Sequence, residues 1–87
     1  MSRTRAVFAI SVAAELAGTA IQNLRVYERH GLVEPDRTAG GTRRYSEADV
    51  DRLVRIRELL DEGLNLAGVA RVLELEEEIA ALRRRKR

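Results

Sequence analysis

The 87-residue sequence contains no cysteine, no tryptophan, one proline and one histidine. Without cysteine the chain can form no disulfide framework and no thiolate zinc site, and it has no thiol for redox sensing. The single imidazole, that of His30, has no second histidine with which to form a metal cluster, so we expect neither a metal nor another cofactor. No nucleophile–base set and no phosphate-binding loop is recognisable either. The sequence therefore does not predict an enzyme.

Long apolar runs are also missing. The longest unbroken stretch covers residues 6–10, and Glu15 follows soon after. Arg3 and Arg5 precede this stretch as basic residues precede a signal peptide, but a signal peptide needs an apolar segment of about 7–15 residues. A membrane span needs about 20. We therefore expect a soluble, cytoplasmic protein with no membrane partner.

The potential hydrophobic core is small. A chain this short buries roughly 60% of the surface that its unfolded form exposes. Twelve alanines, which fill little volume, contribute to an apolar fraction of 45%. Because neither a disulfide nor a bound metal is expected to add stability, we expect burial against a partner chain to supply it.

The first helical segment begins at Ser11, which can cap it, and ends before Gly18. Val12 and Leu16 are four residues apart and predict the buried face of this helix. Residues 8–10 are expected to form a short strand in front of it.

A second helix follows after a tight turn. Thr19 and Gln22, three residues apart, predict a capping box at its start, and the helix runs to about His30. Gly31 is expected to end it as the residue after the C-cap. Two short helices joined by a tight turn that contains glycine are typical of a helix-turn-helix.

The next segment predicts a β-hairpin, or wing. Residues 32–33 and 43–45 flank a loop that contains the only proline and two adjacent glycines. Arg37, Arg43 and Arg44 lie close together in this hairpin and make it basic. A solvated charged hairpin is the alternative to one that contacts nucleic acid.

Two further helices are expected. Ser46 and Asp49 can cap a third helix that Gly63 ends, and Asn65 can cap a last helix toward the C-terminus. The apolar face of the third helix consists of Val50, Leu53, Val54, Ile56 and Leu60.

The last helix carries an apolar stripe with the three–four–three spacing of a coiled-coil seam. Its residues are Val72, Leu75, Ile79 and Leu82. We expect these four side chains to form a dimer contact. Packing of the stripe onto its own domain is the alternative.

Charge is distributed unevenly, although the formal net charge is only +2. Residues 1–57 carry a net +3, residues 58–78 carry −6 and residues 79–87 carry +5. None of the last four glutamates (Glu74, Glu76, Glu77 and Glu78) has a basic residue three or four positions later. Two antiparallel helices would place each acidic block against the basic block of the other chain. We therefore expect an antiparallel homodimer, with a free basic tail that contacts DNA or RNA as the alternative.

Three sequence segments, ISVAAELAG, NLRVYERHGLVEPDR and GGTRRYSEADVDRL, resemble the DNA-binding domain of the MerR family of transcription regulators. The following DEGLNLAGVARVLELEEEIAAL is similar to the heat-shock repressor (HspR) branch of that family. The resemblance implies a mainly α fold: a winged helix-turn-helix with a small β-hairpin wing and a C-terminal dimerisation helix. It assigns residues 1–71 to the DNA-binding domain and residues 72–87 to a short dimerisation helix with a basic tail.

The second helix would be the recognition helix. Ile21 and Leu24 fall on the face toward the core, and Gln22, Asn23 and Val26 fall on the opposite face. The two amides can read adenine and the valine can meet a thymine methyl group in the major groove. Gln22 could instead serve only the capping box, whereas Asn23 has no such local role, and Val26 could be covered by a neighbouring element.

Other candidate contacts have alternatives as well. Arg25 could bind a phosphate or pair with Glu28, and the Tyr27 ring can pack inside while its hydroxyl reaches a phosphate. Tyr45 is grouped with the contacts, although its position favours a structural role in fixing the wing. The full candidate set for DNA binding is Thr19, Gln22, Asn23, Arg25, Val26, Tyr27, Arg29, Arg37, Arg43, Arg44, Tyr45 and Asn65.

The resemblance implies a homodimeric regulator that binds inverted-repeat operators in double-stranded DNA, and in this branch a repressor of heat-shock and chaperone genes. It also implies a DnaK-type chaperone as a co-repressor. Two other functions stay open: a protein-interaction module that docks on a chaperone or a polymerase subunit, and an architectural, excisionase-like protein that bends DNA.

Overall fold

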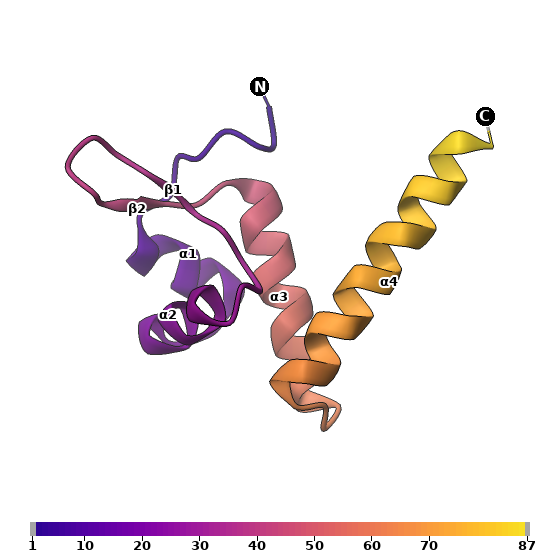
Figure 1. Cartoon of the computed structure of the whole chain (residues 1–87). Helices are drawn as coiled ribbons and strands as arrows, with labels where there is room; N and C mark the ends of the chain where they lie inside the picture. The colour runs from indigo at the N-terminus through magenta and orange to yellow at the C-terminus, as the bar shows by residue number, and fades with distance from the viewer. Residues whose placement is uncertain (1, 87) are drawn as a thin grey trace.

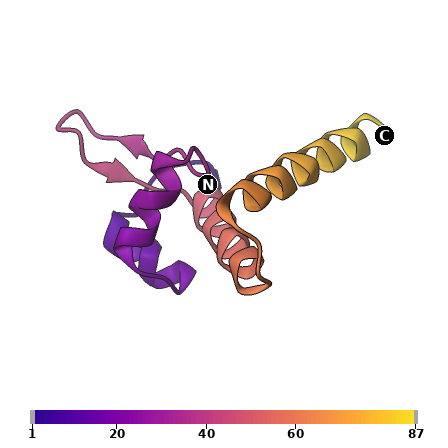
Figure 2. The same ribbon diagram turned by 60° about the horizontal axis from the view of Figure 1, so that its bottom comes forward.

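The computed structural model describes residues 2–86 and is mainly helical, with one small antiparallel hairpin (Figure 1). The elements in chain order are α1 (Ile10–Ala17), α2 (Ile21–Arg29), β1 (Asp36–Arg37), β2 (Arg43–Arg44), α3 (Glu47–Asp61) and α4 (Leu66–Arg85). The hairpin projects to one side of the helical body and α4 extends to the other, as both Figure 1 and Figure 2 show. The predicted fold class, a winged helix-turn-helix, is confirmed.

The turn between α1 and α2 follows from a glycine. Gly18 has φ +72°, a left-handed conformation that a residue with a Cβ rarely adopts. This conformation turns the chain so that the Thr19 N–H donates to the carbonyl oxygen of Ala14 at 3.0 Å. Gly31 has the same φ after α2, which confirms the predicted end of that helix.

The predicted caps of the two later helices are present. The Ser46 hydroxyl accepts the N–H of Asp49 at 3.0 Å, and the Asp49 carboxylate accepts the N–H of Ser46 at 2.9 Å. At the start of α4, the Asn65 side chain accepts the N–H of Gly68 at 2.8 Å. Both arrangements supply partners for N–H groups that the first turn of a helix leaves free.

The predicted starts of α1 and α2 are wrong. α1 begins at Ile10, one residue before Ser11, and no side chain caps it. The expected strand over residues 8–10 is reduced to one isolated bridge between Phe8 and Tyr45, because the chain turns into the helix directly afterwards. The N-cap of α2 is Ala20, again without a side-chain hydrogen bond, so no Thr19 capping box forms.

α1 buries a different face from the one predicted. Ala13, Ala14 and Ala17 are buried, whereas Val12 and Leu16 are 43% and 54% exposed. The spacing of four residues is shared by Val12 and Leu16 and by Ala13 and Ala17, so periodicity alone could not choose between the two faces. Alanines on the inner face let α1 approach α2 and α3 closely.

α3 is the central helix of the core. α1 packs against it on one side and α4 on another, and α1 also packs against α2. The largest fully buried side chains are Tyr45, Leu24, Leu53, Ile56, Val33 and Val69. They come from α2, α3, α4 and the residues that flank the two strands of the hairpin, and α1 adds its buried alanines, so all four helices contribute to one core.

α4 is one continuous helix of 20 residues. Its first half buries Val69 and Leu73 in the core, and its second half extends away from the body (Figure 1). The predicted boundary between residues 71 and 72 lies within this helix, and the division into two domains stays a prediction. Met1 at the start of the first domain and Arg87 at the end of the basic tail lie outside the described residues.

None of the helices within residues 2–86 combines the length and the apolarity that a membrane crossing requires.

Candidate nucleic-acid interface

α2 presents a polar face to solvent and an apolar face to the core. Leu24 is fully buried and Ile21 packs against the core, as predicted. Gln22 and Asn23 are exposed, and Val26 is half-buried. The helix therefore offers two amides and part of one apolar side chain on its outer surface, which are groups that can contact base edges.

Asn23 has a local partner that was not predicted. Its side-chain Nδ2 donates to the hydroxyl oxygen of Thr19, four residues earlier and just before the N-cap of α2, at 2.8 Å. This bond orients the amide and uses only one of its two N–H donors, while the carbonyl oxygen remains available as an acceptor.

The wing is joined to α2 by Glu28. One carboxylate oxygen of Glu28 accepts a hydrogen bond from Arg43 Nε at 2.5 Å, and the other accepts one from Arg37 at 3.0 Å. The alternative ion pair between Glu28 and Arg25 is absent from the described structure. The two wing arginines are 9 and 15 residues away in sequence, beyond the reach of helical spacing rules.

Glu28 is held in its ionised form by these partners. The hydrogen bond from Arg43 lowers the pKa of Glu28 below its ordinary value, although partial burial opposes the shift. The Glu28 side chain is 22% exposed and that of Arg43 is 29% exposed, so this pair is partly shielded from water.

A basic hollow of about 430 Å³ lies between α2 and the wing. It is lined by the arginines Arg25, Arg29, Arg37 and Arg43 and by a single carboxylate, Glu28. Within the described part of the chain, neither Arg25 nor Arg29 makes an ion pair. Four guanidinium groups against one carboxylate leave this hollow strongly positive, which suits a phosphate group.

The other side of the wing carries a second basic hollow of about 440 Å³. Arg44 and Arg5 line it together with Arg37, and Asp36 is its one acidic residue. Arg5 was not among the predicted DNA contacts. It is distant from the hairpin in sequence, so its positive charge was the only indication of a contact.

The two tyrosines of the candidate set are buried. Tyr27 is 5% exposed and Tyr45 is 0% exposed. The structure therefore does not support a DNA contact from the Tyr45 side chain; it supports the structural role that the sequence position favoured. The Tyr45 backbone exchanges two hydrogen bonds with Phe8, at 2.8 and 2.9 Å, which attaches the base of the wing to the start of α1.

Tyr45 has one unusual feature. Its hydroxyl oxygen is buried and has no hydrogen-bond partner among the described residues. Burial raises the pKa of this hydroxyl, and the nearby Glu28 carboxylate adds to the increase.

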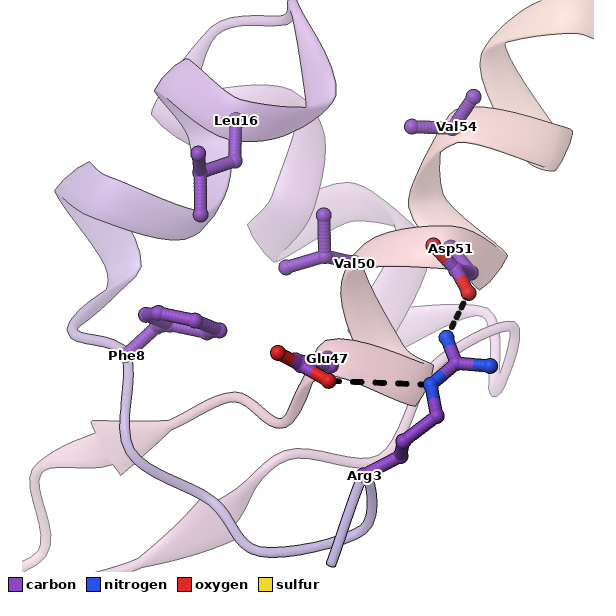
Figure 3. Close-up of a pocket in the computed structure, with 7 residues that line it drawn as sticks. All are labelled: Arg3, Phe8, Leu16, Glu47, Val50, Asp51 and Val54. Atoms are coloured by element: carbon purple, nitrogen blue, oxygen red, sulfur yellow. Dashed lines mark hydrogen bonds and ion pairs between the residues drawn. The ribbon is translucent and has the colours of Figure 1, made fainter. Parts of the chain in front are cut away.

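A third hollow, of about 550 Å³, lies between α1 and the start of α3 (Figure 3). Phe8, Leu16 and Val50 form part of its apolar lining. At its edge Arg3 pairs with Asp51 and, at 3.8 Å, with Glu47. No candidate DNA-binding residue lines it.

The acidic block of α4 has partners within the chain. Glu76 pairs with Arg55 of α3 at 2.8 Å, and Glu77 pairs with Arg52 of α3 at 2.5 Å. The prediction of an antiparallel dimer from unpaired glutamates is therefore weakened, because two of these glutamates are already paired across the α3–α4 contact. Sequence spacing within α4 could not reveal partners on another helix.

The apolar stripe of α4 divides into two parts. Val72 is half-buried and packs against the core of its own chain. Leu75, Ile79 and Leu82 are 40%, 47% and 55% exposed. Packing onto its own domain thus accounts for the first residue of the stripe and leaves the other three on the surface.

Within residues 2–86, no group of three or more histidine, cysteine, aspartate or glutamate side chains is arranged to hold a metal ion.

Comparisons with known proteins identify the family. The sequence model of the MerR HTH family of regulatory proteins matches residues 8–76. A protein of Streptomyces coelicolor named putative heat shock protein HspR is 54% identical over 80 residues, which are 91% of this chain and 53% of that protein. The transcriptional regulator GlnR of Bacillus anthracis is 43% identical over 75 residues, which are 86% of this chain and 58% of GlnR. The chain thus spans between half and three fifths of these relatives.

Solved structures show the same relationship. The lead(II) complex of the transcription regulator PbrR691 from Ralstonia metallidurans has a TM-score of 0.76 and 30% identity, covering 83% of this chain and 57% of that one. HiNmlR, a MerR family regulator bound to promoter DNA, has a TM-score of 0.73 and 25% identity, covering 91% of this chain and 67% of that one. The chain belongs to the MerR family of helix-turn-helix regulatory proteins.

Proposed function

We propose that this chain is a sequence-specific DNA-binding transcription regulator in which α2 enters the major groove and the wing lies against the backbone. The observation that carries the proposal is the four-arginine hollow beside the exposed polar face of α2. Groups for phosphate contact and groups for base contact thus occur on adjacent surfaces, and a reading helix needs both.

The contacts divide into two kinds. Gln22, Asn23 and Val26 on the outer face of α2 would read base edges, with Thr19 orienting the Asn23 amide. Arg25 and Arg29 have no ion pair in the described structure, so their full charge is available to phosphates. Because a phosphate contact positions the helix without reading sequence, we expect these arginines to contribute affinity to every DNA.

The wing and the start of α4 would add backbone contacts. Arg44 is half-buried at the base of the wing and, together with Arg37 and Arg43, supplies its positive charge. The Asn65 side chain is used as a cap, so at this position the backbone N–H groups of the first turn of α4 would meet a phosphate.

The biological role follows from the relatives. The similarity to a protein named as a heat shock protein, HspR, supports a repressor of heat-shock and chaperone genes. HiNmlR, which was solved on promoter DNA, supports promoter DNA as the target. Occupancy and distortion of an inverted-repeat operator would be the mechanism.

A homodimer is part of the proposal. Leu75, Ile79 and Leu82 form an exposed apolar stripe on the part of α4 that extends away from the body. A second copy lying antiparallel along this stripe would bury it and would present two α2 helices to two half-sites. A DnaK-type chaperone acting as co-repressor is proposed from the HspR similarity alone.

The test is DNA binding across a salt series. Sites would be selected from a random DNA pool with this chain, and binding to a selected inverted repeat would be compared with binding to a scrambled duplex of the same composition. We expect tighter binding to the selected site and a steep loss of affinity with salt. Equal affinity for the two duplexes would contradict a sequence-specific regulator.

A matched pair of variants tests the assignment of α2. Asn23→Ala removes a proposed base contact, and Glu62→Ala changes an exposed residue at the end of α3, away from α2 and the wing. We expect Asn23→Ala to reduce the preference for the selected site and Glu62→Ala to leave it unchanged.

A further inference from the structure

We propose that Glu28 is a positioning residue that fixes the wing relative to α2, so that an acidic side chain inside the DNA-binding surface increases sequence discrimination. This inference rests on the proposed function. From sequence alone, Glu28 was expected only as a possible partner of Arg25.

The Glu28 carboxylate contacts both strands of the wing. Arg37 and Arg43 lie directly opposite each other in the register of the hairpin, one on β1 and one on β2. Two like charges at such a position destabilise a strand pair. Glu28 accepts from both, one oxygen to each arginine, so a single carboxylate on α2 offsets this repulsion and attaches both strands.

The hairpin has little stability of its own. Each strand is only two residues long, and a two-stranded hairpin is marginally stable alone. At its base the wing is attached through the Phe8–Tyr45 bridge. Nearer the tip, the ion pairs to Glu28 are the contacts that join the two strands to α2. Without Glu28 we expect the wing to change its direction relative to α2.

A purely electrostatic role and a positioning role for Glu28 predict opposite changes in DNA affinity when the residue is removed. If Glu28 acted only through its charge, its removal would leave the hollow more positive and would strengthen binding to any DNA. If it positions the wing, its removal lets the phosphate contacts of the wing hold α2 in a different register, so that base contacts at the selected site are lost and binding there weakens more than binding to scrambled DNA. The ratio of affinities for selected and scrambled DNA separates the two.

The experiment compares Glu28→Gln with Glu34→Gln and Glu28→Asp. Glu34 is an exposed carboxylate outside this hollow, so Glu34→Gln removes the same charge without breaking these ion pairs. Glu28→Asp keeps the charge and shortens the side chain by one methylene group. We expect both Glu28 variants to lower the ratio of affinities by roughly tenfold, and Glu34→Gln to leave it unchanged. Equal ratios for Glu28→Gln and Glu34→Gln would overturn the inference.

A second measurement does not need DNA. Because the chain has no cysteine, spin labels can be attached specifically at Ala39→Cys in the wing loop and Glu62→Cys at the end of α3. We expect the distance distribution between the labels to broaden or shift with Glu28→Gln and to stay the same with Glu34→Gln. An unchanged distribution with Glu28→Gln overturns the positioning role. Failure of the unsubstituted chain to prefer a selected site would count against the proposed function, while this distance measurement would still decide the role of Glu28.

Discussion

The carboxylate of Glu28 on α2 and the guanidinium of Arg43 on β2 are 2.5 Å apart, which makes an ion pair between residues 15 positions apart in sequence. This pair lies inside the basic hollow that would receive DNA. This ion pair determines how much of the positive charge of the wing is left free and in which direction the wing points. The same carboxylate also makes the stability of the wing dependent on pH.

Acidification should remove the stabilisation that Glu28 provides. Its pKa is lower in the folded chain than the ordinary value of about 4.3, because Arg43 hydrogen-bonds to the ionised form. In the window between these pKa values the unfolded chain binds more protons, so stability rises with pH there. The stabilisation is fully present above the unfolded pKa and is lost as pH falls through the folded pKa.

Urea unfolding of the unsubstituted chain and of Glu28→Gln from pH 7 down to pH 2.5 measures this effect. We expect the difference in free energy of unfolding to be constant near neutral pH and to shrink below about pH 4.3. A difference that does not change with pH would show that the ionised carboxylate is not what stabilises the wing.

Removal of the Tyr45 hydroxyl should stabilise the chain. This hydroxyl is buried without a hydrogen-bond partner in the described structure, and leaving such a group unsatisfied costs about 1–3 kcal/mol. We expect Tyr45→Phe to raise the free energy of unfolding by about 1 kcal/mol and to leave DNA binding unchanged. Weaker DNA binding by Tyr45→Phe would restore Tyr45 as a contact residue.

Signals that act within one turn of the chain predicted much of this fold. The Ser46–Asp49 capping box and the Asn65 cap each join residues three positions apart, and the glycine after α2 is a single residue with positive φ. Such pairs meet where the helix begins at the expected residue, as in α3 and α4, whereas α2 has Ala20 as its N-cap and the Thr19 capping box does not form. Local signals also predicted the order of the four helices and the hairpin, and the resemblance to the MerR family then identified this order as a winged helix-turn-helix.

Long-range partners could not be predicted in the same way. Glu28 has its partners on the wing and Glu76 has its partner on α3, because tertiary packing brings these elements together. The prediction of the buried face of α1 was wrong for a related reason. Larger apolar residues suggested Val12 and Leu16, but close approach of the helices favours the small Ala13 and Ala17.

Arg44 should contribute to DNA affinity without contributing to specificity. It forms no ion pair among the described residues, unlike Arg43, and its charge is therefore available to a phosphate. We expect Arg44→Ala to weaken binding to selected and scrambled DNA alike and to reduce the slope of log affinity against log salt by about 0.9. Arg43→Ala combined with Arg44→Ala should flatten the slope further, and an unchanged slope would count against a wing contact.

The ion pairs between α3 and α4 should stabilise the angle between these helices. Arg55 makes hydrogen bonds to both carboxylate oxygens of Glu76, and these bonds raise the pKa of the guanidinium. Arg71 and Glu74 form a pair within α4 at 3.3 Å and provide a matched control. A double-mutant cycle on Arg55 and Glu76 should give a larger coupling in urea unfolding than the same cycle on Arg71 and Glu74, and equal couplings would contradict this.

The exposed stripe of α4 should carry the dimer. Ile79 is 47% exposed in the middle of the stripe, and Ala80 is the exposed residue next to it. Sedimentation should show that Ile79→Glu shifts the chain toward monomer, whereas Ala80→Glu changes the equilibrium less, since a charge within a buried seam costs more than one beside it. Equal behaviour of the two variants would place the interface elsewhere.

Charge reversal at the end of α4 should have a smaller effect than Ile79→Glu. Since Glu76 and Glu77 are paired with α3, an antiparallel partner meets an acidic block that is already partly neutralised. Exposed ion pairs contribute only about 0–1 kcal/mol each in any case. We therefore expect replacement of Arg83, Arg84 and Arg85 by glutamate to weaken the dimer measurably in low salt and much less in high salt. An intact dimer in low salt would refute the antiparallel arrangement of charges while leaving the apolar stripe as the interface.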